Sequence, residues 1–230
     1  PGELTSEVTT DDGVTHRIER IDSPEATAAL SAAIEPKKVW IADGPEPASD
    51  LYRDFLRVIR ERHISVVRIS ARTPTRDVNG VLISCLSPTT DHPEPSLFED
   101  DDTANDRSLV LKLVYGRTSF LLPADISDRI ESRLVAKNAE LRSNVLFVPH
   151  HGGRHSSSEQ FLRHVAPESA VVSCGWENRF HNPHPDVLNR FARLGIRLYR
   201  TDLDGAIRMV SDGRRIQTDV AMRPSKLSAH

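Results

Sequence analysis

The sequence has little cysteine, and the placement of its two cysteines excludes the commonest cysteine-based sites. Cys85 and Cys174 lie far apart and form no C-x-x-C pair, which argues against a cysteine zinc site and against a disulfide framework. A single bridge between these two residues stays open as an alternative. Cysteine usage therefore does not indicate the cellular compartment of the protein.

The chain also lacks an excess of positive charge and any long apolar run. Its formal net charge is -3, from 30 lysines and arginines against 33 aspartates and glutamates, and the two signs are interspersed. No basic stripe indicates tight nucleic-acid binding, although a nucleic acid can still be a substrate. No apolar segment is long enough to span a membrane, and no signal peptide is visible.

At 230 residues the chain is long enough to bury the core of one domain. Its amino-terminal segment, residues 1–22, is polar and weakly patterned, whereas residues 23–220 alternate between helix-like and strand-like patterns. Residues 221–230 form a short carboxyl-terminal tail. We therefore predict an α/β domain over residues 23–220, with sheets covered by helices.

The second half of that domain has the clearest patterns. Alternating apolar residues predict a hairpin over residues 108–122, and helical spacing predicts a helix over residues 127–137. A strand is expected over residues 145–148. Ser156 with Glu159 three residues later predicts a capping box at the start of the next helix.

Histidines gather directly after the strand at residues 145–148. Six of the ten histidines fall between His150 and His184, and the first two are followed by two glycines. Neutral imidazole is the commonest protein ligand for zinc, and glycine lets the backbone approach a bound ion or anion closely. The pair His150 and His151 therefore predicts a metal or phosphate site at a sheet edge. Single histidines such as His155 and His164 are more typical of solvated loops and helices.

An aspartate marks the end of another apolar strand. Asp125 follows Phe120-Leu-Leu-Pro-Ala, so an acid sits where the strand breaks off, a place from which carboxylates commonly point into sites. Taken alone, an aspartate in front of a helix is more typical of a helix cap. The residues around Asp125 favour a position in a site over a helix cap.

Six stretches between residues 105 and 208 match a known family when they are taken together. They are Asn105-Asp-Arg-Ser-Leu-Val-Leu111, Phe120-Leu-Leu-Pro-Ala-Asp125, Val148-Pro-His-His-Gly152, Ser156-Ser-Ser158, Asn178-Arg-Phe-His-Asn-Pro-His-Pro185 and Tyr199-Arg-Thr-Asp202 with Gly205. In these stretches the chain resembles the carboxyl-terminal half of metallo-β-lactamase-fold hydrolases of the ComEC type. That family comprises the hydrolase domain of the competence DNA-uptake protein and its free-standing relatives.

The resemblance implies a metallo-β-lactamase-like αββα sandwich with a binuclear metal site, where metal-activated water attacks a phosphodiester or similar bond. It implies that Asp125 binds a metal and that the histidine pair supplies a further ligand, for which we favour His151. His150, His184 and Asn105 are the expected catalytic residues, with His150 touching the substrate. The expected cofactor is a divalent metal, zinc or manganese, which lowers the pKa of bound water. The expected substrate is DNA or a nucleotide.

The sequence departs from the family at positions that concern this site. Pro123-Ala124-Asp125 stands where the family usually has Thr-Gly-Asp, and His181 and Asn182 replace glycine and histidine. The family's Thr-His-x-His-x-Asp-His segment provides most of the metal ligands. Here its only counterpart is Thr15-His-Arg-Ile-Glu-Arg-Ile21, which keeps one histidine. We therefore expect the amino-terminal part of the fold to be lacking or degenerate, and the metal to be bound weakly or not at all.

Three functions follow from these expectations. The first is a metal-dependent hydrolase of the metallo-β-lactamase superfamily that acts on phosphodiester bonds. The second is a catalytically impaired or truncated domain that binds a nucleic acid, nucleotide or protein partner. The third is a structural module whose histidines no longer have a function. Upstream sequence that restores the missing ligands favours the enzyme, whereas a native start near Pro1 favours the binding module. A free-standing protein is expected in the cytoplasm, and a domain of a DNA-uptake protein is expected outside it and attached to the membrane.

Overall fold

The structure is a computed structural model of the 230-residue chain. It describes residues 6–9, 15–18, 36–44, 46, 50–89, 105–137 and 139–222. The chain divides into two compact units, residues 1–41 with 46–68 and residues 42–45 with 69–230, and each unit is described by itself. Most of the predicted segment 1–22 and most of the tail 221–230 lie outside the described residues.

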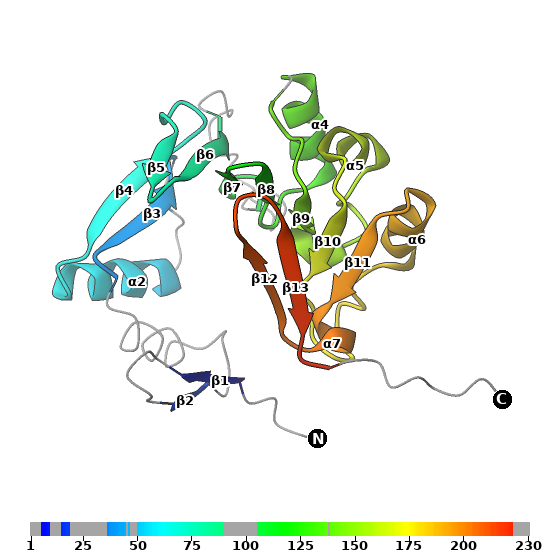
Figure 1. The fold of residues 1–230 in the computed structure, drawn as a ribbon. Coiled ribbons are helices and arrows are strands. Elements are labelled where there is room, and N and C mark those ends of the chain that lie inside the picture. The colour runs from blue at the N-terminus through cyan, green and yellow to red at the C-terminus, as the bar shows by residue number, and fades with distance from the viewer. Residues whose placement is uncertain are drawn as a thin grey trace. The chain divides into compact units, whose positions relative to one another are not determined.

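Among its described residues, the smaller unit contains two short sheets and one helix (Figure 1). β1 (Ser6–Thr9) pairs antiparallel with β2 (Thr15–Ile18), and β3 (Lys38–Ala42) pairs with β4 (Ser65–Ile69). α2 (Asp50–Glu61) connects β3 to β4 and is amphipathic, with apolar residues at helical spacing and charged residues between them.

The larger unit is built on a seven-stranded sheet with the order β11-β10-β9-β8-β7-β6-β5. Its strands are β5 (Arg76–Val78), β6 (Val81–Ser87), β7 (Val110–Tyr115), β8 (Thr118–Leu122), β9 (Val145–Phe147), β10 (Ser169–Val172) and β11 (Arg197–Arg200). β5 to β8 form an antiparallel meander, whereas β8 to β11 run parallel to one another. The sheet is therefore mixed, and its parallel half carries the helical crossovers.

In the part of the larger unit that the structure describes, three helices cover one face of this sheet (Figure 1). α4 (Asp128–Ala136), α5 (Glu159–Val165) and α6 (Pro185–Arg193) each connect two neighbouring parallel strands. Alternate strand residues point towards the helices, and together they form the main hydrophobic core. The fully buried members of this core are Val110, Leu121, Ile126, Leu146, Phe161, Val165, Ala170, Val172 and Val187.

A hairpin lies against the opposite face of the sheet (Figure 1). After α7 (Thr201–Asp204), β12 (Ile207–Ser211) and β13 (Ile216–Val220) pair antiparallel. An apolar cavity of about 510 Å³ separates β12 from β7 to β10, and its lining includes Phe120, Phe147 and Met209. The strands thus present apolar residues to both faces, which explains why β7 to β10 are nearly continuous hydrophobic runs.

The predicted α/β class is confirmed, with helices covering one face of a large mixed sheet. The predicted hairpin over 108–122 and the helix over 127–137 are present as β7–β8 and α4. The capping box at Ser156 was wrong, because the N-cap of α5 is Ser158, whose side chain accepts the backbone N–H of Phe161 at 3.3 Å. Ser156 lies two residues before this N-cap and donates its hydroxyl to backbone carbonyls instead.

Glu131 is a buried carboxylate that links two of the helices. It belongs to α4, is 0% exposed, and accepts the backbone N–H groups of Ser157 and Ser158 at the start of α5. Burial raises the pKa of the Glu131 carboxyl, and the hydrogen bonds from Ser158 and Ser157 oppose this rise. A raised folded pKa means that the fold favours the protonated acid. The stability that Glu131 contributes is therefore complete below its unfolded pKa of about 4.3, and it is lost as pH rises through the folded pKa.

Replacing Glu131 with glutamine should remove this pH dependence. We compare the free energy of unfolding of the unsubstituted chain with that of the Glu131→Gln variant. The first value minus the second should fall as pH rises from about 4 to about 8, because only the unsubstituted chain must ionise a buried carboxyl. Urea unfolding across this range measures the difference, and a difference that grows with pH would contradict the account. Glu131→Ala leaves the buried N–H of Ser157 and the half-buried N–H of Ser158 without this acceptor and should cost about 2–4 kcal/mol.

Candidate metal centre at the carboxyl edge of the sheet

Four parallel strands of the larger unit end at the same edge of the sheet, which we call the carboxyl edge. Asp125 follows β8, and His150 and His151 follow β9. Two residues without a predicted role complete the row, Cys174 after β10 and Asp202 after β11. Ligands of open α/β sheets bind outside the carboxyl ends of parallel strands, so this edge is where a site is expected.

The turn that follows β9 has an unusual backbone. This turn (Pro149–Gly152) places two consecutive side-chain-bearing residues in the left-handed region, His150 with φ 50° and His151 with φ 54°. Gly152 follows with φ 76°, and a Cβ added there would lie 2.7 Å from Cβ of Pro183. Glycine is required at this position both for its backbone conformation and for the close approach of the proline.

Hydrogen bonds from neighbouring elements hold this turn in place. The backbone N–H of His150 donates to the carbonyl of Ala124 at 3.1 Å, and that of His184 donates to the carbonyl of Gly152 at 2.8 Å. The Ser156 hydroxyl donates to the turn at 2.9 Å. Left-handed residues cost about 1–3 kcal/mol each and persist only where the surroundings determine them. These bonds therefore fix the histidine pair against the segments that precede α4 and α6.

The structure brings Asp125 and His151 together. Nε2 of His151 lies 3.7 Å from Oδ1 of Asp125, and Nδ1 of His151 lies 2.8 Å from the carbonyl oxygen of Ser173. Because a carbonyl only accepts, Nδ1 must carry the proton in this contact, and the neutral ring then presents the lone pair of Nε2 towards the carboxylate. A metal-binding histidine is commonly oriented in this way, through a backbone carbonyl at its other nitrogen.

This pair is accessible to solutes. The side chains of His151 and Asp125 are 52% and 42% exposed, so a metal ion can reach both without rearrangement of the core. The 3.7 Å separation of the two atoms is also close to the spacing of two ligands on one small cation. The pair can therefore serve as two ligands of one divalent ion.

The ring of the first histidine, His150, has a different environment. His150 is half-buried, and its ring lies over Gly153, where an added Cβ would be 3.7 Å from two ring atoms. Its backbone amide reaches Ala124, one residue before Asp125. His150 is thus the sequence neighbour of His151, but its ring makes no hydrogen bond or ion pair with Asp125 or His151 among the described contacts.

The ring of His184 is occupied by other partners. It is the N-cap of α6, and its Nδ1 lies 3.2 Å from the backbone N–H of Asp186. Its Nε2 lies 3.0 Å from Nε of Arg154. A neutral imidazole has only one accepting nitrogen, so only one of these two contacts is a hydrogen bond at a time. The structure therefore brings the backbone of His184 to the Pro149–Gly152 turn, which we call the histidine turn. The side chain of His184 faces Arg154 and the helix.

Asn105 is followed by Asp106, whose side chain reaches the segment after β8. The Asp106 carboxylate is 3% exposed and accepts the hydroxyl of Ser127 at 2.5 Å and Nε of Arg129 at 2.7 Å. Ser127 lies two residues after Asp125, so this buried acid ties the start of β7 to the end of β8. Sequence reasoning assigned no role to Asp106, although it lies inside the stretch 105–111 that carries the family resemblance.

Cys174 and Asp202 form a second polar cluster on the carboxyl edge. The Cys174 thiol donates to Oδ1 of Asp202 at 3.1 Å, and Arg200 binds the same carboxylate at 2.6 Å. Burial, followed by the contact with Asp202, raises the pKa of Cys174 to about 11. The raised pKa keeps the thiol protonated at neutral pH, as its hydrogen bond to Asp202 requires. Both cysteines are free, so the alternative of a bridge between Cys85 and Cys174 is wrong.

Two aromatic side chains lie exposed in the loop between β10 and α6. Trp176 and Phe180 are 61% and 67% exposed, and the guanidinium of Arg179 lies 4.6 Å from the centroid of the Phe180 ring. Exposed rings of this kind offer surfaces on which nucleic-acid bases can stack.

The metal-ligand set is incomplete in the part of the chain that the structure describes. Among those residues no three histidine, cysteine, aspartate or glutamate side chains lie close enough to share an ion. Catalytic zinc sites use three protein ligands and structural sites four. Asp125 and His151 are two side chains of the kinds that such sites use, which is one fewer than a catalytic zinc site has.

Comparisons with known proteins found similar sequences among bacterial competence and recombination proteins. The chain is 31% identical over 152 residues to ComE operon protein 3 of Bacillus subtilis (strain 168), 43% identical over 104 residues to competence protein ComA of Neisseria gonorrhoeae, and 31% identical over 105 residues to recombination protein 2 of Haemophilus influenzae. These matches cover 66%, 45% and 46% of the chain. The chain is related to competence proteins.

The matched regions are only small parts of those relatives. They span 18%, 15% and 13% of the three proteins, respectively. No family model matches the chain. A solved structure from Parabacteroides distasonis ATCC 8503, described as a candidate metal-dependent hydrolase, covers 87% of the chain at 12% identity, with 99% of its own length aligned. Its TM-score of 0.44 is too low to add to the fold described above. Among the described residues, no helix is long and apolar enough to cross a membrane.

Replacing Gly152 with alanine should disrupt the histidine turn. The new Cβ needs a left-handed backbone and meets Pro183, so the free energy of unfolding should fall by about 3 kcal/mol or more. Gly195→Ala is a matched control, because Gly195 also has a positive φ (67°) but has nothing within 4 Å of the added atom. It should lose only the conformational part, about 1–2 kcal/mol. Equal losses in urea unfolding would show that the contact with Pro183 does not constrain the turn.

Proposed function

We propose that the chain is a domain of the metallo-β-lactamase superfamily that carries out metal-dependent hydrolysis of phosphodiester bonds. The observation that supports this proposal best is the pair formed by Asp125 and His151, with Nδ1 of His151 anchored to a carbonyl and Nε2 facing the carboxylate at 3.7 Å. Carboxylate oxygen and neutral imidazole nitrogen are both ligands for zinc and manganese. We propose these two side chains as metal ligands.

The surroundings of the pair suit an anionic substrate. We propose that His150, His184 and Asn105 act on the substrate beside the metal. Arg154, whose Nε lies 3.0 Å from Nε2 of His184, adds a positive charge two residues after the Pro149–Gly152 turn. A bound divalent ion would supply a low-pKa water and would polarise a phosphate oxygen. His184 and Arg154 would then hold and orient the phosphate group.

The names of the relatives favour one class of substrate. They are named as competence and recombination proteins, and both processes act on DNA. We therefore propose DNA or a nucleotide as the substrate of this chain, with zinc or manganese as the metal. The exposed rings of Trp176 and Phe180 support this choice, because every base has a face that can stack on them.

A second candidate function is a binding module with impaired catalysis. It is favoured by the finding that only two candidate ligands converge among the described residues. Two ligands hold a metal more weakly than three or four, and a weakly held metal activates water poorly. On this alternative the domain binds a nucleic acid, nucleotide or protein partner without turning it over.

Metal titration and hydrolysis assays with matched variants test both candidates. We expect zinc or manganese to bind with a Kd in the micromolar to millimolar range, about -8 to -4 kcal/mol, and to lose affinity at least tenfold in Asp125→Ala and His151→Ala. Hydrolysis of bis-p-nitrophenyl phosphate and single-stranded DNA with manganese should fall in the same two variants. His164→Ala is the control, because that exposed histidine lies on α5 and binds a backbone carbonyl.

The outcomes separate the two candidates. Turnover that is lost in Asp125→Ala and His151→Ala but kept in His164→Ala supports the hydrolase. Metal binding at this pair with equal background hydrolysis in all proteins leaves the binding module. If His164→Ala loses as much metal affinity as the two site variants, the assignment of the metal ligands is wrong.

A further inference from the structure

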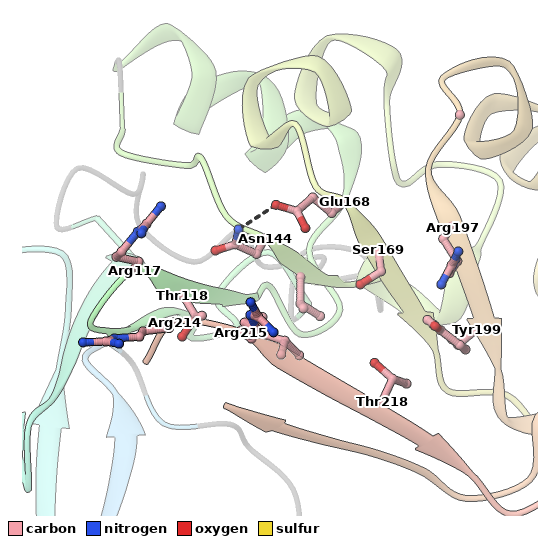
Figure 2. Close-up of a pocket in the computed structure, with 13 residues that line it drawn as sticks. Arg117, Thr118, Asn144, Glu168, Ser169, Arg197, Tyr199, Arg214, Arg215 and Thr218 are labelled. Atoms are coloured by element: carbon pink, nitrogen blue, oxygen red, sulfur yellow. Dashed lines mark hydrogen bonds between the residues drawn. The ribbon is translucent and has the colours of Figure 1, made fainter. Parts of the chain in front are cut away.

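A second cavity lies at the opposite end of the parallel strands from the carboxyl edge. It has a volume of about 650 Å³ and is bounded by the first residues of β8 to β11 on one side and by β13 on the other (Figure 2). We call it the arginine pocket. Its charged lining residues are Arg117, Arg197, Arg214, Arg215 and Glu168.

The charge of this pocket is opposite to that of the whole chain. Four arginines and one glutamate give the lining a formal charge of +3 (4 − 1), whereas the chain carries -3. Glu168 accepts the side-chain amide of Asn144 at 2.9 Å, so it is not turned towards a guanidinium. In the part of the chain that the structure describes, none of the four guanidinium groups has an ion pair within 4.0 Å. The pocket therefore carries a local excess of positive charge, which the Asp212 carboxylate offsets in part at Arg215.

A contact between two backbone turns assembles three of these arginines. The N–H of Arg117, in the β7–β8 turn, donates to the carbonyl of Gly213, in the β12–β13 turn, at 2.6 Å. A Cβ added to Gly116 would lie 2.4 Å from that same carbonyl oxygen, so the two turns meet only because glycine is present. Each turn carries arginine directly after its glycine: Arg117 in one, and Arg214 and Arg215 in the other.

The carboxylate of Asp212 fixes the shape of the second turn. It accepts the backbone N–H groups of Arg214 and Arg215, each at 2.7 Å, and these bonds lower the pKa of Asp212. The Thr118 and Ser211 hydroxyls bond to each other at 2.6 Å and join the base of the turn to β8. The arginines thus extend from a rigid backbone frame, so less conformational entropy is lost when they bind an anion.

The fourth arginine comes from the opposite wall of the pocket. Arg197 and Tyr199 alternate along β11 with Leu198, which packs against the core on the helix side. Figure 2 shows Arg197 and Tyr199 on this wall and Arg215 on the side of β13. Uncharged hydrogen-bonding groups from both sides also line the pocket. They are Thr118, Asn144, Ser169 and Thr218.

We propose that the arginine pocket binds the phosphate groups of a nucleotide, either free or within a single strand. Guanidinium groups bind phosphate through paired hydrogen bonds, and hydroxyl and amide groups commonly complete such contacts. The ring of Tyr199 offers a stacking face for a base, and the volume lies in the range of small-molecule sites. This site goes beyond the proposed hydrolysis, because it uses no metal ligand and lies at the other end of the strands.

Binding measured in EDTA tests this proposal separately from the metal site. The probes are ATP and a fluorescein-labelled oligothymidine of about twelve nucleotides, followed by calorimetry and by fluorescence anisotropy at several salt concentrations. Replacing Arg197 and Arg215 together by alanine should weaken binding at least tenfold. It should also lower the salt dependence of oligonucleotide binding, by about 1.4 in the log–log slope. The Arg197→Lys and Arg215→Lys double variant should keep part of the affinity.

A variant with the same loss of charge is the control. Arg133→Ala with Arg193→Ala removes two exposed arginines from α4 and α6, on the other face of the sheet. This variant should bind both probes as the unsubstituted chain does. Equal weakening in the two double variants would overturn the proposal, as would the absence of binding to both probes at low salt. Displacement of the oligonucleotide by ATP would place both phosphate sources in one pocket. Displacement by polyglutamate at equal charge concentration would reject the preference for phosphate.

Discussion

The histidine turn after β9 is the constraint on which the carboxyl edge depends. Two consecutive residues with positive φ, His150 and His151, turn the chain sharply at the sheet edge, and Gly152 lets Pro183 pack directly on the backbone. The turn bonds to the segment after β8 and to the start of α6, while β9 itself pairs with β8 and β10. Strain of this kind is typical of functional sites. The position of His151 is therefore fixed by the backbone contacts of the turn and not by its own side chain alone.

The parallel half of the sheet gives its two ends different chemistry. At the carboxyl edge, carboxylate, imidazole and thiol groups follow the four strands, and Asp125 and His151 offer ligand atoms to a cation. At the other end, arginines extend from two turns and from β11 around the arginine pocket. The hairpin β12–β13 contributes to this second end through its turn, which meets the β7–β8 turn. A single framework thus places groups suited to cations at one end and groups suited to anions at the other.

Local periodicity was enough to predict most of the larger unit, but not its long-range contacts. β7, β8 and α4 follow from apolar spacing and from Gly116 at the hairpin turn, and the residues at strand ends follow from the parallel arrangement. β13 was missed, although its half-buried residues alternate along the strand. The Cys174–Asp202 contact joins residues 28 positions apart, which no local pattern links. The contact between the ring of His184 and Arg154 depends on side-chain conformations, and the roles of His184, His150 and Asn105 stay predictions.

Anomalous diffraction from crystals of the chain grown with zinc tests the central claim most directly, because it locates a bound ion without reference to activity. We expect a peak within ligand distance, about 2.0–2.2 Å, of both Oδ1 of Asp125 and Nε2 of His151, with Nδ1 of His151 still bonded to Ser173. The peak should be absent from crystals of Asp125→Ala. Zinc bound only at other histidines, such as His155 or His164, with none at this pair, would show that Asp125 and His151 are not metal ligands.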